Sequence, residues 1–161
     1  MLTKKILGFK NFYMSFSLSL LILFSVIYCG YSITLGVILF SLFMFLNMSI
    51  NTTFYDLKDM ELDKQQKLRT LPLYLGKKRF LKVLHVLNVV SFVPLVLGVW
   101  LAVLPVFTLI LFVMFVSGFY YIQKAFDPQA NLDFLSYVVV DGQYYLLLIL
   151  VFIGTFACGF S

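Results

Sequence analysis

Charged residues are scarce in this chain. Of its 161 residues, 12 are Lys or Arg and 7 are Asp or Glu, so charged residues make up 12% of the sequence, whereas hydrophobic residues make up 62%. A composition so poor in charge lies far outside the range of soluble domains and excludes that class. We therefore interpret the chain as an integral membrane protein.

Two sequence patterns are also missing. The D-x-D-x-D-G pattern of a calcium-binding loop is absent, which excludes that kind of site. Residues 26–29 lack the small side chain that signal-peptide cleavage requires, and the apolar run before them is too long for a signal peptide. We therefore expect this run to remain as a membrane span. Cys29 and Cys158 could meet on one side of the membrane, although buried thiols acting as small hydrophobic groups are favoured.

Apolar runs long enough to cross a hydrocarbon core occur five times. They cover residues 12–30, 32–50, 83–103, 105–123 and 135–158. All should be helices, because lipid offers backbone groups no hydrogen-bond partners. The sequence thus predicts an all-α fold, a polytopic membrane helix bundle that forms a single membrane domain over residues 1–161.

The charges gather in three segments that five spans would place on one side of the membrane. These segments are the N-terminus, the loop 51–82 and the connection before the fifth span. Because they carry the Lys and Arg residues, the positive-inside rule predicts that this side is cytoplasmic. We expect a multi-pass protein of the cell membrane, with the C-terminus on the opposite side, the lipid bilayer as its partner and no nucleic-acid partner.

Three aspartates in the loop 51–82 are the most informative feature of the sequence. Asp56, Asp59 and Asp63 are spaced by three and then four residues, a spacing that a helix would place on one narrow stripe of its surface. Two carboxylates about 5 Å apart repel by roughly 3 kcal/mol at an effective dielectric of 20. We therefore expect a cation against the stripe, and Mg²⁺ holding a diphosphate is the candidate. The second span should continue as a helix that carries the aspartates.

Basic residues follow the aspartates in the same loop. Lys67, four residues after Asp63, would return to the acidic stripe, where it could contact Asp63 or a phosphate. The guanidinium of Arg69 could bind a phosphate bidentately. Pro72 should end the helix, and Lys77 then opens a basic cluster of the kind that cytoplasmic loops commonly carry.

The motif from Asp56 to Asp63, followed by Arg69-Thr70-Leu71-Pro72 and Leu75-Gly76, resembles the second aspartate-rich motif of the UbiA-type intramembrane prenyltransferases. The resemblance implies a bundle like the latter half of a nine-helix fold. It also implies transfer of a prenyl group from an allylic diphosphate to an aromatic or other lipid-soluble acceptor. Asp56, Asp59 and Asp63 would then be the catalytic, metal-binding carboxylates, and Lys67, Arg69 and Lys77 would bind the diphosphate. Lys67 and Leu62 stand where family members often have glycine.

The family's first motif, an Asn-Asp pair followed by two more aspartates, does not occur in these 161 residues. A diphosphate with its metal ions requires ligands from both sides of a dry cavity. We therefore expect this chain to be inactive alone, as a fragment, a remnant or one subunit completed by a second polypeptide.

Four further residues are candidates to line the cavity. Asp141 is the only charged side chain inside a predicted span, so it should face either the cavity or the interface. Tyr137 and Tyr144 would share one helical face, where they could shield an allylic cation or only pack. Asn51 either orients the aspartates or marks the membrane exit.

Two other functions are alternatives to prenyl transfer. The CDP-alcohol phosphotransferases are also membrane enzymes with helical aspartates, but they need an Asp-Gly-x-x-Ala-Arg segment, whereas Asp141-Gly142 is followed here by Gln143 and two tyrosines. The remaining alternative is a non-enzymatic small membrane protein with a structural or cation-handling role.

Overall fold

The computed structural model describes residues 8–159, with the side chains of 151 and 154–159 excluded. Lys4 and Lys5, which belong to the charged N-terminal segment, lie outside this part. The Cys158 side chain also lies outside it, so the pairing of Cys158 with the exposed Cys29 is not tested. No strand occurs in residues 8–159. The prediction of an all-α polytopic bundle is confirmed, because five helical stretches are long and apolar enough to cross a membrane: Phe9–Tyr28, Leu35–Lys58, Lys77–Trp100, Val106–Lys124 and Leu132–Leu150.

The helical elements follow the order of the predicted spans, with shifted ends. They are α1 (Phe9–Tyr28), α2 (Leu35–Lys58), α3 (Met60–Gln65), α4 (Leu71–Leu75), α5 (Lys77–Trp100), the 3₁₀ helix η2 (Val106–Leu111), α6 (Phe112–Lys124), α7 (Leu132–Phe134), the π-helix η3 (Leu135–Val140) and α8 (Asp141–Gly159). The largest shift is in α2, which extends beyond residue 50 because residues 50–54 are buried within the bundle.

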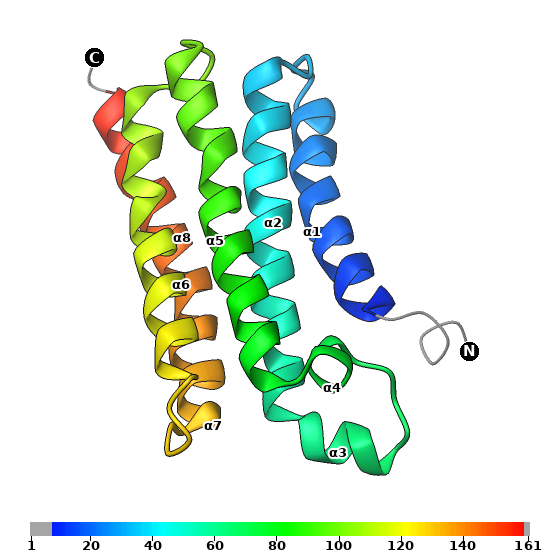
Figure 1. Cartoon of the computed structure of the whole chain (residues 1–161). Helices are drawn as coiled ribbons and strands as arrows, with labels where there is room; N and C mark the ends of the chain where they lie inside the picture. Colours follow the sequence, from blue (N-terminus) through cyan, green and yellow to red (C-terminus); the bar gives the residue numbers. More distant parts are fainter. Residues whose placement is uncertain (1–7, 160–161) are drawn as a thin grey trace.

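Helix α2 has a central position in the bundle. It packs against α1 on one side and α5 on the other (Figure 1). It also contacts η3. The start of α1, the segment α3–α4 and α7 lie at one end of the bundle, while α8 ends at the other (Figure 1). This arrangement brings the beginning of α1 close to the motif at the end of α2.

The bundle contains two apolar clusters with a polar layer between them. One cluster lies toward the α3–α4 end and includes Phe54, Phe80 and Leu84; the other includes Phe43 and Leu95. Burial of apolar side chains contributes little to helix association in a membrane, because the lipid tails are equally apolar. Close packing and interhelical hydrogen bonds therefore contribute more to the stability of the bundle.

The polar layer is centred on the fully buried Asn51 of α2. Its Nδ2 donates to Gln143 Oε1 of α8 at 2.9 Å, and its Oδ1 accepts from the Tyr121 hydroxyl of α6 at 2.9 Å. Gln143 Nε2 donates in turn to the carbonyl of Met114 at 3.3 Å. Three helices are thereby joined at one level, which fixes the rotation of α2 about its axis.

Candidate functional site

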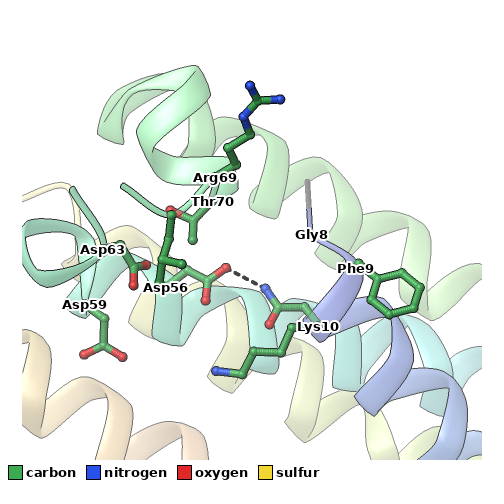
Figure 2. A pocket seen from close by; sticks show the side chains of 10 residues that line it. Gly8, Phe9, Lys10, Asp56, Asp59, Asp63, Arg69 and Thr70 are labelled. Carbon is green, nitrogen blue, oxygen red and sulfur yellow. Dashed lines mark hydrogen bonds between the residues drawn. The ribbon is translucent and has the colours of Figure 1, made fainter. Parts of the chain in front are cut away.

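A pocket of about 250 Å³ lies where the beginning of α1 meets the end of α2 and the segment after α3 (Figure 2). All three aspartates of the motif line it, although they come from three different local structures. The lining residues are Gly8, Phe9, Lys10, Asn11, Asp56, Asp59, Asp63, Leu68, Arg69 and Thr70. The pocket is therefore acidic on the α2–α3 side and carries cations on the α1 and loop sides.

The predicted unbroken helix through the aspartates is wrong. Helix α2 ends at Lys58, and Asp59, with φ −85° and ψ 7°, separates it from the short helix α3. Asp59 still donates its backbone N–H to Tyr55 O and accepts from Asp63 N at 2.8 Å, so the bend costs few backbone hydrogen bonds. Because of this bend, Asp56, Asp59 and Asp63 do not form a single stripe but a curved surface, here called the acidic wall.

The segment after α3 also differs from the prediction. Pro72 does not end the aspartate helix but stands in the first turn of α4, where its missing N–H is tolerated. The helix ends earlier, at Gln65, and Lys67 follows in the left-handed region with φ 55°. Leu68 N can then donate to Asp63 O at 2.9 Å. A left-handed conformation gives a physical reason for a glycine at position 67.

Asp56 is anchored by a residue that the sequence analysis missed. Asn11 Nδ2 of α1 donates to Asp56 Oδ2 at 2.6 Å (dashed line in Figure 2), and only 4% of Asn11 is exposed. One turn further along, Ser15 Oγ lies 3.1 Å from Thr52 Oγ1. Nothing in the local spacing connects Asn11 with a residue 45 positions away, although the predicted topology placed both at the same side of the membrane.

The electrostatics of the pocket disfavour three bare carboxylates. Burial raises the pKa of Asp63 above its ordinary value, and the negative charge of Asp59 raises it further, while Lys10 opposes both effects. Asp59 is partly compensated by Lys58, whose Nζ lies 3.8 Å from it and 3.8 Å from Asp133. In Figure 2 the guanidinium of Arg69 is turned away from the carboxylates. The acidic wall therefore has room for further positive charge.

Of the three basic residues predicted to bind the diphosphate, only one lines the pocket. Arg69 lines it, whereas Lys67 is exposed outside it and Lys77 lies at the start of α5, also outside it. Lys10, which the sequence analysis did not assign to the site, is a lining residue. The cations of the pocket thus come from α1 and the loop, not from the basic cluster of α5.

None of the four predicted cavity residues lines this pocket. Asn51 belongs to the buried polar layer, and Asp141 accepts a hydrogen bond from the Tyr55 hydroxyl on the α8 side of α2. Tyr137 is 58% exposed and lies under Lys58, whose Nζ is 3.9 Å from the ring centroid. Tyr144 is half-buried against the second apolar cluster. Tyr137 lies within the π-helix η3 and Tyr144 in α8, so the unbroken α-helical register that would place them on one face does not hold.

The donor set of the pocket fits magnesium in one particular mode. Its anionic ligands are carboxylates, which hard cations prefer. Among the described residues, however, no three His, Cys, Asp or Glu side chains are close enough to hold one ion. Mg²⁺ typically takes one or two carboxylates, several waters and substrate phosphates. The pocket therefore fits an ion shared with a phosphorylated ligand better than an ion held by protein alone.

Five membrane-length helices with an acidic pocket at one end define a polytopic, all-helical membrane protein. The model of the UbiA prenyltransferase family matches residues 1–138, and the chain belongs to this family. Enzymes of the family are generally metal-dependent. Comparison with curated proteins and with solved structures finds no match.

Proposed function

We propose that this chain forms the second-motif half of a magnesium-dependent prenyl-transfer site. The donor would be an allylic diphosphate, and the acceptor an aromatic or other lipid-soluble molecule. The observation that carries the proposal is the shared pocket: Asp56, Asp59 and Asp63 line one hollow with two cations at the end of a membrane bundle. Family membership supports the same reaction class.

Each charged lining residue has a chemical role in this proposal. Asp56, Asp59 and Asp63 would contribute one or two carboxylates to each Mg²⁺, with the other ligands from water and the diphosphate, and the ion would stabilise negative charge on the departing diphosphate. Lys10 and Arg69 would contact the diphosphate oxygens, Arg69 after its side chain turns inward. The surrounding apolar helices would keep water away from the allylic cation.

We further propose that transfer needs carboxylates from outside these 161 residues. The Asn-Asp type first motif is absent from this sequence, and the pocket's own described carboxylates do not surround an ion by themselves. A second polypeptide or a further segment would supply the opposite wall. The pocket would open to the cytoplasm, because the basic residues flank it.

Ligand binding tests the site independently of catalysis. The full chain in detergent is titrated with a non-hydrolysable prenyl diphosphate analogue, with and without Mg²⁺. We expect Mg²⁺-dependent binding, which Asp56→Asn and Asp63→Asn each weaken by roughly tenfold or more, since loss of even an outer partner of a metal ligand typically costs about 10–100-fold. Asp127→Asn is the matched control, because Asp127 lies in the turn after α6 and outside the pocket.

The result also separates the proposal from its alternative. A non-enzymatic cation-handling protein would bind the metal with no preference for the lipid analogue. Equal analogue binding by wild type and Asp56→Asn would contradict the site. Prenyl transfer by the purified chain with Mg²⁺ alone would contradict only the need for a second part.

A further inference from the structure

Helices α1 and α2 are antiparallel neighbours joined by two polar contacts one helical turn apart. Asn11 contacts Asp56, and Ser15 contacts Thr52. Residues four apart lie on the same face of a helix, so the two contacts form a ladder along one α1–α2 seam. Only the Asn11 rung reaches the pocket.

The Asn11 rung constrains one carboxylate oxygen of Asp56. Asn11 Nδ2 engages Oδ2 at 2.6 Å, and within residues 8–159 no other side-chain donor bonds to Asp56. Because Asn11 is 4% exposed and α1 is packed along α2, the amide cannot swing away. The other oxygen, Oδ1, is left without a described donor on the pocket side of the pair.

We propose that Asn11 is a positioning residue of the site: it fixes the Asp56 carboxylate through Oδ2 and leaves Oδ1 available to a divalent cation. This inference rests on the proposed function, because it concerns the same pocket. A hydrogen bond to a ligating carboxylate orients it and reduces the freedom lost on binding, which is how outer-shell partners tune metal sites. Helix α1 thereby takes part in the site, although the aspartate motif belongs to α2 and α3.

Binding of Mn²⁺ to the full chain in detergent in the presence of inorganic diphosphate, measured by electron paramagnetic resonance, tests this role, because the pocket fits an ion shared with a phosphorylated ligand. We expect Asn11→Leu, which keeps a side chain of similar size without the donor, to weaken Mn²⁺ binding by about 10–100-fold. Ser15→Ala is the matched control, because it removes the neighbouring rung of the same seam and should leave the affinity within about twofold. If Asn11→Leu does not fold, Asn11→Ser, which is too short to reach Asp56, replaces it.

A double-mutant cycle distinguishes positioning from a general effect on packing. If Asn11 acts through Asp56, Asn11→Leu should cause no further loss of affinity in the Asp56→Asn background. Two outcomes would overturn the role of Asn11 but leave the proposed site intact. Either the losses of Mn²⁺ affinity in the two variants are additive, or Asn11→Leu binds Mn²⁺ like the wild type while Asp56→Asn binds it more weakly. Equal Mn²⁺ binding by wild type and Asp56→Asn would instead overturn the proposed site, and the role of Asn11 with it.

Discussion

Replacing Asn51 by leucine should destabilise the bundle by about 1–3 kcal/mol. Asn51 is fully buried and makes interhelical hydrogen bonds of 2.9 Å with both Gln143 and Tyr121. Interhelical hydrogen bonds in membrane proteins are worth about 0.6 kcal/mol on average and up to about 1.7 kcal/mol, and two are lost together. Leucine occupies a similar volume, so the loss reports the hydrogen bonds more than the packing.

The assay is reversible unfolding of the full chain in mixed micelles of rising denaturing-detergent content, followed by circular dichroism. Thr53→Val is the matched control on α2: Thr53 is also buried, but among the described residues its hydroxyl bonds only to Ser49 O of its own helix. This control should cost about 0.5 kcal/mol or less, because the Ser49 carbonyl keeps its helical environment.

A second comparison tests the reason for the loss. Asn51→Leu leaves the Tyr121 hydroxyl and Gln143 Oε1 without their partner in an apolar interior, and such orphaned groups carry much of the cost. Combining it with Tyr121→Phe should therefore recover part of the stability. If Asn51→Leu is no less stable than Thr53→Val, or if Tyr121→Phe only adds to the loss, the reasoning about the polar layer is wrong.

Three further predictions concern the pocket and its loop. Lys67→Gly should stabilise the chain by up to about 1 kcal/mol in the same unfolding assay, because position 67 has φ 55° and lacks a role in the pocket lining; a clear loss would contradict this. Lys10→Met should strengthen binding of Mn²⁺ alone but weaken Mg²⁺-dependent binding of the diphosphate analogue, because the Lys10 ammonium repels the metal ion and attracts the diphosphate. If both affinities change in the same direction, the assignment of Lys10 to the diphosphate site is wrong. Because the pKa of Asp63 is raised in the folded state, the metal-free chain should lose stability as pH rises from about 4, the ordinary value for Asp, through that raised pKa. Mn²⁺ affinity should increase over the same pH window, and Asp63→Asn should reduce the pH dependence of both stability and affinity.

The sequence was sufficient to predict the bundle, because membrane-length apolar runs leave few alternatives to helices. It also drew attention to the aspartates that line the pocket. The bend at Asp59 was not predictable from their spacing, because an acidic stripe is compatible with a helix and the chain loses few hydrogen bonds by leaving it there. In the sequence, Lys67 is only a departure from the family pattern, whereas the structure shows that this position has a left-handed backbone conformation.

Contacts between distant segments account for what the sequence left out. Asn11 and Lys10 stand at the start of the first span, where a polar pair is ordinary, and only packing of α1 on α2 brings them to the motif. Similarly, the π-helix η3 cannot be read from Leu135–Val140 by apolar periodicity, so Tyr137 and Tyr144 were assigned to one face.

The end of α2 connects the polar layer with the pocket through two rows of hydrogen-bonding residues, which are offset by one residue along the helix. Asn51 and Tyr55 share a face that contacts α6 and α8, while Thr52 and Asp56 share a face that contacts α1. Since adjacent residues project in different directions around a helix, the rotation that satisfies one row determines where the other points. The buried hydrogen bonds of Asn51 therefore help to fix which face of α2 carries Asp56 toward α1, where Asn11 then holds its carboxylate. In this way a residue outside the acidic pocket contributes to the geometry of the pocket.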